Sequence, residues 1–136
     1  MKKIIILAVM LAWVFTACSK SGNVTVDFPL QYPTTPSYIA PANNATNLSK
    51  VLTLSWHESK DPQGDPVFYD VIVSPSTELN FLGYYSLNLT EPTTSINLTG
   101  GNYDNYNDFY WQVTAKDNHN NVSAGPIWHF IVAGQK

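Results

Sequence analysis

Apolar and polar residues alternate along the chain in short runs from residue 36 onward, which is the spacing of half-buried β-strands. The run at 108–116 is the clearest, because every second residue from Phe109 to Ala115 is apolar. Proline, glycine and asparagine separate the runs, and no helical period appears in this part of the chain. The pattern predicts an all-β protein, an antiparallel β-sandwich of about seven short strands. The runs lie at 51–56, 67–74, 81–89, 94–98, 108–116 and 127–132.

The N-terminus follows a different pattern. Lys2 and Lys3 precede an unbroken apolar run of 12 residues, 4–15, and small residues then lead to Cys18. A short apolar run with a charged start and a small-residue cleavage site is a secretory signal, and it is too short for a comfortable membrane span. The sequence therefore predicts a signal peptide at 1–17, which contributes nothing to the fold of the mature protein.

The cleavage site has a second feature, the position of the only cysteine. The segment Phe15-Thr16-Ala17-Cys18 resembles the lipobox of bacterial lipoproteins, although Leu is more frequent at its first position. The resemblance implies that diacylglycerol is attached to the Cys18 thiol, that the chain is cut before Cys18, and that the new amine is acylated. The alternative is an ordinary signal peptide followed by an incidental cysteine.

The composition divides the mature chain into three parts. Residues 18–36 are rich in Ser, Gly, Asn, Thr and Pro and predict a lipidated N-terminus with a flexible tether, in which 24–26 are able to pair as a short strand. Residues 37–133 form the predicted sandwich, and 134–136 are a C-terminal tail.

The charge of the mature chain limits its partners. Five lysines stand against ten acidic residues and there is no arginine, so the formal charge is −5. Nucleic-acid recognition depends on cationic side chains, and on arginine above all, so nucleic acid is excluded as a predicted partner. The same charge makes the chain poorly suited to electrostatic attraction to anionic lipid, so the predicted membrane attachment depends on the acyl chains of Cys18.

Several motifs resemble a fibronectin type III domain of the kind found in bacterial lipoproteins. They are Thr53-Leu54-Ser55-Trp56, Tyr69-Asp70-Val71, the run 109–115, and the Gly-Pro-x-Trp-x-Phe ending at 125–130. The resemblance covers about 37–133 and implies an immunoglobulin-like sandwich. One position departs from it: Phe109 stands where the family often has the tyrosine of a tyrosine corner. The corner hydrogen bond then requires Tyr106 or Tyr110 as a substitute.

On that fold, Trp56 and Trp111 are expected to meet between the sheets. Tyr69, Phe109 and Phe130 lie on the same inward register of their strands. An aromatic side chain can bury roughly 150–250 Å². Because a single cysteine allows no intrachain disulfide, these aromatic residues are predicted to be core and not a sugar platform.

Catalytic signatures are absent from the sequence. The only thiol is the predicted lipidation site, and the histidines are His57, His119 and His129. We expect His57 and His129 to point outward and His119 to lie in a loop, so no nucleophile with a base and an orienting acid is predicted. Zinc spacing, phosphate-binding loops and dinucleotide motifs are also missing. The sequence predicts a protein that is not an enzyme and holds no cofactor, calcium being the one ion to consider.

A calcium site is one interpretation of the acidic loops. The fibronectin-like topology implies that the loops after the 51–56 and 108–116 strands share one end of the sandwich, and their oxygen ligands suit Ca²⁺. The alternative is that Asp and Asn bond their own backbone in turns. Lys60 and Lys116 flank the loops and are expected to balance part of the charge. The candidate ligands are Asp61, Asp65, Asp117 and Asn120.

Two pairs of tyrosines are candidate ligand-binding residues. Tyr84 and Tyr85 are adjacent in a strand, so one of them faces outward, whereas Tyr103 and Tyr106 lie in a loop rich in Asn and Asp. Exposed tyrosine beside polar side chains suits stacking on a sugar ring. The alternative is that Tyr103 or Tyr106 folds back as a plug over the end of the sandwich.

The sequence favours a non-catalytic, lipid-anchored module of the cell envelope that acts in adhesion, display or scaffolding. Ser19 follows Cys18, and by resemblance to lipoprotein sorting rules this implies the outer membrane of a Gram-negative bacterium. The domain then faces either the periplasm or the exterior, and the sequence does not decide between the two faces. The alternative function is a carbohydrate-binding accessory lipoprotein of a glycan-capture system. The expected partners are thus the membrane, through acylated Cys18, and a protein or a glycan.

Overall fold

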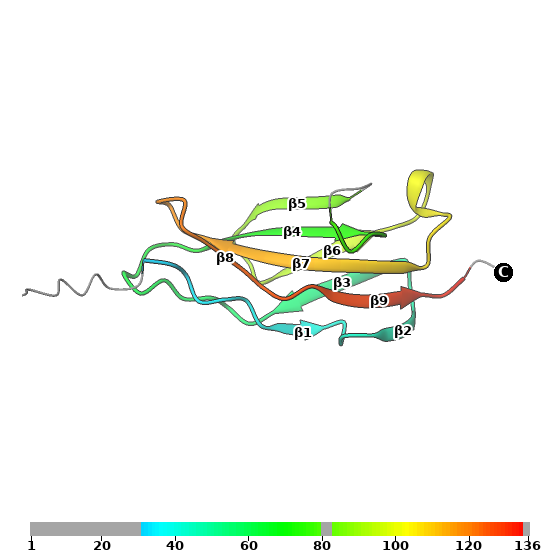
Figure 1. The fold of residues 1–136 in the computed structure, drawn as a ribbon, viewed down its shortest axis with the longest axis horizontal. Coiled ribbons are helices and arrows are strands. Elements are labelled where there is room, and N and C mark those ends of the chain that lie inside the picture. The colour runs from blue at the N-terminus through cyan, green and yellow to red at the C-terminus, as the bar shows by residue number, and fades with distance from the viewer. Residues whose placement is uncertain (1–30, 80–82, 135–136) are drawn as a thin grey trace, which may run out of the picture.

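The computed structural model describes residues 31–79 and 83–134 of the 136-residue chain. Two β-sheets pack face to face in an elongated sandwich (Figure 1). The three-stranded sheet has the order β1 (Tyr38–Ala40), β3 (Val51–Trp56), β6 (Thr93–Asn97). The six-stranded sheet has the order β2 (Ala45–Leu48), β9 (Trp128–Val132), β7 (Asp108–Lys116), β4 (Phe68–Ser74), β5 (Tyr84–Leu89), and β8 (Val122–Ala124) also pairs with β7. One short 3₁₀-helix, η1, spans Gly101–Tyr103.

The predicted all-β sandwich is confirmed. The described part contains nine strand segments where about seven were predicted, because the first and last strands are each interrupted. The chain passes from β1 in one sheet to β2 in the other at Pro41, whose preceding peptide bond is cis. Between β8 and β9 the interruption is Gly125-Pro126. β2 runs parallel to β9, and the other pairs between described strands are antiparallel.

The hydrophobic core fills the space between the sheets. The five aromatic residues assigned to it from the sequence are each at most 1% exposed: Trp56, Tyr69, Phe109, Trp111 and Phe130. Aliphatic residues on the inward register of β3, β4 and β7 complete it, which confirms the predicted alternation. The core extends from Tyr38 to Val132 in the sequence, so residues 19–136 contain all of it.

The hydroxyl of Tyr38 joins β1 to the opposite sheet. It donates to the carbonyl of Pro126 at 2.6 Å and accepts from the backbone N–H of Val113 at 2.9 Å, while its ring stacks on Trp111 at 4.3 Å. Burial raises the pKa of Tyr38 to about 12, although the Val113 hydrogen bond lowers it. Gly125 is required beside it, because a Cβ there would collide with the tyrosine ring.

The Tyr38 hydroxyl bonds to the backbone across the sandwich and not within its own strand, so it is not a tyrosine corner. Among the described residues, the hydroxyls of Tyr106 and Tyr110 make no hydrogen bond to the backbone, so neither of them substitutes for the corner tyrosine. The ring of Tyr106 packs against the core, and the ring of Tyr110 lies 4.8 Å from that of His129.

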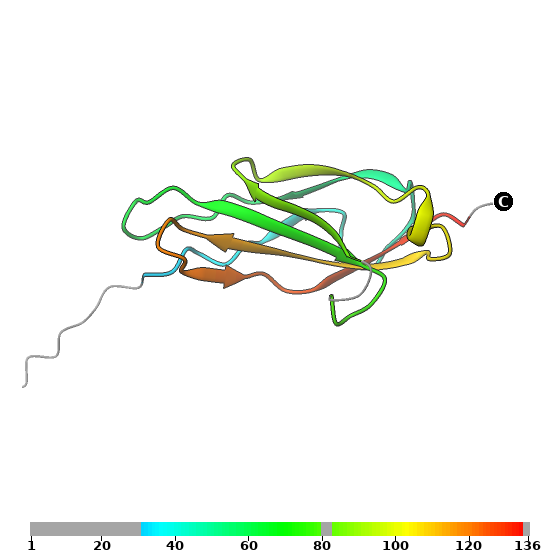
Figure 2. The same cartoon turned by 90° about the horizontal axis from the view of Figure 1, so that it is seen from above.

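The sandwich includes residues that the sequence assigns to the tether. Pro33 and Pro36 are buried, and Thr34 exchanges two hydrogen bonds with Lys60, from its backbone N–H at 2.9 Å and to its side-chain oxygen at 2.8 Å. The segment from residue 31 and the end of β9 lie at opposite ends of the sandwich (Figure 2). The predicted signal peptide, Cys18, the rest of the tether and the start of the 81–89 run lie outside the described residues. Within the described ranges, no helix has the length and apolar character needed to cross a bilayer.

Candidate functional site

One end of the sandwich brings together the loops 57–67 and 117–121, which we call the acidic pole (left in Figure 1). Asp65 joins them: its Oδ2 lies 3.1 Å from Nδ1 of His119, and its Oδ1 accepts from the side chain of Asn118 at 3.5 Å. The expectation that these loops share one end is therefore confirmed. Lys116 instead pairs with Asp70, at 2.7 Å from its Nζ, and the side chain beside Asp65 is the imidazole of His119.

Asp117 is the centre of a turn at this pole. Its Oδ1 accepts from the backbone N–H groups of His119 at 2.8 Å and Asn121 at 2.9 Å, and its Oδ2 accepts from the Asn121 side chain at 2.7 Å. Burial raises the pKa of Asp117, but these hydrogen bonds and the charge of His119 together hold the pKa below its usual value. Asn120 completes the turn with a positive φ of 67°. Both oxygens of the Asp117 carboxylate thus accept hydrogen bonds from their own loop, Oδ1 from the backbone and Oδ2 from the Asn121 side chain.

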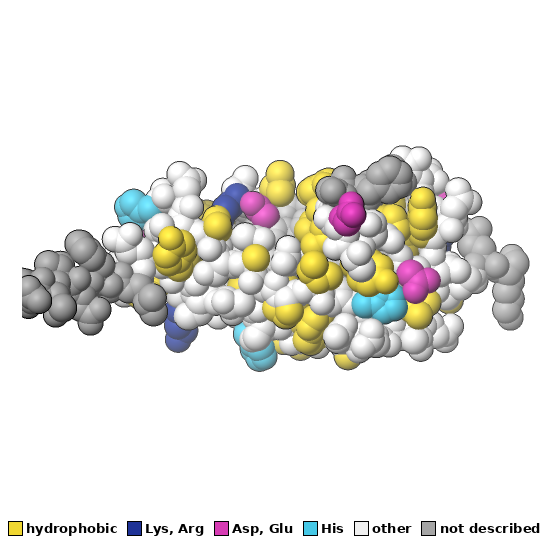
Figure 3. Space-filling view, viewed as in Figure 1, with side chains coloured by type: hydrophobic (Ala, Val, Ile, Leu, Met, Phe, Trp, Pro, Cys, Tyr) yellow, Lys and Arg dark blue, Asp and Glu magenta, His cyan; other side chains and the backbone are white. Residues whose placement is uncertain are grey.

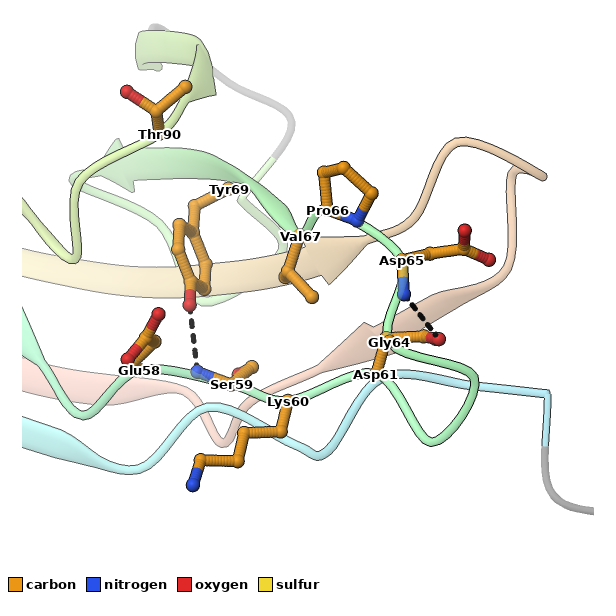
Figure 4. A pocket seen from close by; sticks show the side chains of 10 residues that line it. All are labelled: Glu58, Ser59, Lys60, Asp61, Gly64, Asp65, Pro66, Val67, Tyr69 and Thr90. Atoms are coloured by element: carbon orange, nitrogen blue, oxygen red, sulfur yellow. Dashed lines mark hydrogen bonds between the residues drawn. The ribbon is translucent and has the colours of Figure 1, made fainter.

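Asp61 organises the other loop in the same way. Its Oδ1 accepts from the backbone N–H groups of Gln63 at 2.8 Å and Asp65 at 3.2 Å. A pocket of about 340 Å³ lies beside it, and at its edge the Tyr69 hydroxyl accepts from the backbone N–H of Ser59 at 2.7 Å (Figure 4). Within the described ranges, no group of three or more His, Cys, Asp or Glu is arranged to hold a metal ion.

The opposite end, which we call the aromatic pole, consists of β-strand ends closed by the loop 98–107. Tyr103 and Tyr106 are half-buried and pack against the core, with the Tyr103 ring 6.4 Å from Phe109. Lys50 fixes the loop by donating to the carbonyls of Tyr103 at 3.5 Å and Asp104 at 3.3 Å. Both tyrosines therefore lie in the plug arrangement that the sequence left open.

Tyr84 and Tyr85 point to opposite faces of the six-stranded sheet, as the alternation of side chains along a strand requires. Tyr84 is half-buried against the core, whereas Tyr85 is 54% exposed on the outer face of the six-stranded sheet. The four candidate tyrosines thus do not form one platform, and Tyr85 alone presents its ring to solvent.

The outer face of the six-stranded sheet is a surface that sequence reasoning missed. Hydrophobic side chains gather over one half of it (Figure 3). Leu87 is 60% exposed beside Tyr85 on β5, and Ile72 lies directly opposite Tyr85 on β4. The signal in the sequence was the pair of apolar residues Tyr85 and Leu87 on the outward face of β5, and the periodicity is weak because the inward face mixes apolar Tyr84 and Leu89 with polar Ser86.

Comparison with solved structures identifies the fold. The fibronectin type III domain of human fibronectin type III domain containing protein 3 superimposes with a TM-score of 0.53 at 12% identity, over 80% of this chain and 94% of that one. The fold is that of a fibronectin type III domain. An Fn3-like protein from Clostridium thermocellum matches with a TM-score of 0.48 at 16% identity, over 76% of this chain and 97% of that one.

A third similar structure is pectate lyase Pel3 from Pectobacterium carotovorum, with a TM-score of 0.42 at 18% identity over 75% of this chain and 27% of that one. No family model and no curated protein matches the sequence. Similarity at these identities shows the fold alone, and this fold supports many functions. The function therefore has to be argued from the residues of this chain.

Proposed function

We propose that this protein is a non-catalytic, lipid-anchored module of the cell envelope that acts in adhesion, display or scaffolding. The observation that carries the proposal is the position of Cys18, the only cysteine, directly after the apolar run and the small residues of a cleavage site. Each buried methylene of an acyl chain stabilises membrane binding by about 0.8 kcal/mol, so several chains on one residue anchor a small domain stably.

The arrangement of the domain supports this role. The chain enters the sandwich at the acidic pole, so an anchor at Cys18 leaves the aromatic pole and the outer sheet face free to meet a partner. Asp117 and Oδ1 of Asp61 accept hydrogen bonds within turns of the acidic pole, whereas Asp61 Oδ2 and Ser59 Oγ are buried without a partner. None of the described histidines adjoins a serine or threonine in the hydrogen-bonded geometry of a triad. Ser19 after Cys18 favours the outer membrane as the proposed location.

The anchor is tested by fractionation of cells that express the full chain. We expect the wild type to remain in the membrane fraction after a high-salt wash, and Cys18→Ser to be lost from it. Ser19→Asp is the matched control, because it keeps the acylated cysteine and is expected to stay membrane-bound while moving to the inner membrane. Retention of Cys18→Ser in washed membranes would overturn the proposal.

The alternative, a carbohydrate-binding accessory lipoprotein, has one supporting observation, the exposed ring of Tyr85. It predicts binding on a glycan array that Tyr85→Ala removes. Tyr32→Ala is the control, since Tyr32 is 56% exposed on another part of the surface. Saturable binding that depends on Tyr85 would make the alternative the better description.

A further inference from the structure

The pocket of about 340 Å³ in the acidic pole contains polar atoms that the fold leaves unsatisfied (Figure 4). Two of the residues that line it hold a buried side-chain oxygen without a hydrogen-bond partner, Ser59 at Oγ and Asp61 at Oδ2. Ser59 is 4% exposed and Asp61 is 9% exposed, so both residues are more than nine-tenths buried. A polar atom that is buried without a partner is costly, and two such atoms at one pocket point to a missing ligand.

The position of the two oxygens separates them from the other unsatisfied atoms. Among the described residues, the remaining buried atoms without a partner are the indole nitrogens of Trp56 and Trp111, which lie among core side chains. The pocket therefore holds both of the unsatisfied oxygens. Open space adjoins them in the loop, since a Cβ at Gly64 would meet no heavy atom beyond its chain neighbours within 4 Å.

Local hydrogen bonds fix the two residues beside the pocket. The Tyr69 hydroxyl accepts from the backbone N–H of Ser59 at 2.7 Å. Oδ1 of Asp61 accepts from the backbone N–H of Asp65 at 3.2 Å, so the Asp61 side chain points across the loop (Figure 4). One oxygen of this carboxylate thus orders the turn, and the other remains for a ligand.

The charge of the pocket favours a cation. Three acidic side chains line it, Glu58, Asp61 and Asp65, against the one basic side chain of Lys60. Figure 4 shows the Lys60 side chain extending away from the pocket. A buried carboxylate oxygen without a partner is satisfied best by a donor that carries positive charge, because charge-assisted hydrogen bonds are the strongest.

A primary ammonium group fits these oxygens better than a metal ion does. Ca²⁺ takes about six to eight oxygen ligands, and the described residues hold no group of three or more His, Cys, Asp or Glu placed to bind a metal. A primary ammonium group on a carbon chain has only three N–H donors to satisfy. The Asp61 carboxylate, the Ser59 hydroxyl and the exposed Glu58 carboxylate supply that number of acceptors.

The pocket also has an apolar side. Pro66, Val67 and the ring of Tyr69 line it together with the polar residues. The methylene stem of a lysine side chain packs on such apolar surface while its charged end binds oxygen. The combination of acidic and apolar walls therefore suits an alkylammonium group, in which a positive charge stands at the end of a carbon chain.

We propose that this pocket binds a primary alkylammonium group, supplied by the side chain of a lysine or by a small free amine. Its N–H groups donate to Asp61 Oδ2 and Ser59 Oγ, and its carbon chain packs on Val67. Both acceptor atoms lie beneath the surface of the pocket, so binding moves the exposed tip at residues 62–64 outward. The site does not involve Cys18, so it stands independently of the proposed anchor.

A titration of ¹⁵N-labelled residues 19–136, which contain the whole core, with n-butylammonium chloride tests the pocket. We expect saturable ¹H–¹⁵N shift changes at the amides of residues 58–67, with a Kd on the order of 1–10 mM for so small a ligand. Tetramethylammonium chloride at the same concentrations is the control ligand. It carries the same charge without an N–H donor and is expected to produce no saturable change.

Two variants locate the contact. Asp61→Asn keeps an oxygen for the turn but removes the charge, and it is expected to weaken binding at least about tenfold. Ser59→Ala removes one acceptor and is expected to weaken binding about threefold or more. Glu78→Gln is the matched control, because it removes an exposed carboxylate beyond the far end of β4, and it is expected to bind like the wild type. Circular dichroism melts establish that each variant is folded, and Ser59→Ala carries the test if Asp61→Asn is not.

The source of the amine is distinguished by a second ligand, Nα-acetyl-lysine N-methylamide, whose only amine is the side-chain group. Tighter binding of this compound than of butylammonium supports a lysine of a partner protein, and equal or weaker binding supports a free amine. No saturable change with butylammonium would overturn the proposal. An equal response to tetramethylammonium, or binding that persists unchanged in the folded Asp61 and Ser59 variants, would overturn it as well.

Discussion

The two poles of the sandwich are closed by different chemistry. At the acidic pole, Asp61 and Asp117 use carboxylate oxygens to accept backbone N–H groups of their own loops. At the aromatic pole, Tyr103 and Tyr106 lay their rings against the core, and Lys50 holds the loop by its carbonyls. Carboxylate hydrogen bonds thus order the loops at one end of the two sheets, and aromatic packing covers the core at the other end.

The difference shows how residues that suggest function can be used by the fold. Carboxylates resemble metal ligands and loop tyrosines resemble a sugar platform, yet at each pole the structure gives these groups intramolecular partners. The outer face around Tyr85 and Leu87 has no such role in the described contacts. Outside the pocket beside Asp61, the poles are therefore interpreted as structural, whereas Tyr85 and Leu87 lie exposed on the outer sheet face.

The largest loss of stability is expected from truncating Trp111, which belongs to the core between the two poles. Trp111 is fully buried midway along β7, between the acidic and aromatic poles. Trp111→Ala is expected to lower the free energy of unfolding by about 3–5 kcal/mol, because it removes buried area and leaves a cavity. Urea unfolding followed by circular dichroism measures the change. A Trp111→Ala domain with wild-type stability would contradict the shared core.

A smaller effect is expected from the hydroxyl of Tyr38. Tyr38→Phe leaves the buried N–H of Val113 without its acceptor and is expected to cost about 1–3 kcal/mol at neutral pH. The raised pKa means that the folded state favours the neutral phenol, so this stabilisation is complete below pH 10.0 and is lost as pH rises toward about 12. Urea unfolding at several pH values should show a steeper alkaline loss for the wild type than for Tyr38→Phe. Parallel losses would show that another group is responsible.

Two tyrosines sharpen the contrast between the aromatic pole and the sheet face. Tyr106 packs against the core, whereas Tyr85 is largely exposed. Tyr106→Ala is expected to lower the free energy of unfolding by about 1–2 kcal/mol and Tyr85→Ala to change it by less than about 0.5 kcal/mol. Chemical denaturation of the two variants side by side makes the comparison. If Tyr85→Ala proved the more damaging change, the assignment of the two roles would have to be reversed.

The smallest effect is expected from calcium at the acidic pole. Asp117 uses both of its oxygens in hydrogen bonds and Asp61 uses Oδ1, so of these two carboxylates only the buried Oδ2 of Asp61 has no partner. A ligand that binds only the folded state raises its stability with concentration. Melting curves of residues 19–136 in about 5 mM Ca²⁺, Mg²⁺ or EDTA are therefore expected to coincide. A rise specific to Ca²⁺ that disappears in Asp65→Asn would make this pole a metal site.

The longer strands were predictable from the sequence and the shorter ones were not. The 108–116 run agrees with the bounds of β7, because nine alternating residues define a period clearly. β1, β2 and β8 have three or four residues each, and their pairing is set by tertiary contacts such as the Tyr38 hydroxyl. Alternation within β5 requires one of its adjacent tyrosines to face outward, but the apolar character of both leaves the choice to the register with β4.

The site was predictable in its placement and not in its contacts. The topology implied that the two acidic loops meet, and the 3.1 Å contact between Asp65 and His119 confirms it. The partner of Lys116 was not predictable from its neighbours in sequence, because the side chain points outward from β7 toward Asp70 on the adjacent strand. Such cross-strand contacts depend on register, which the pattern of a single strand does not contain.

The structural interpretation of the two poles is tested most directly by one measurement, ¹H–¹⁵N spectra of residues 19–136 with and without about 5 mM Ca²⁺. The account predicts unchanged amide shifts at residues 61–65 and 117–121, because the carboxylates of Asp61 and Asp117 accept the backbone N–H groups of these loops. Saturable shift changes specific to Ca²⁺ in these two loops would contradict it.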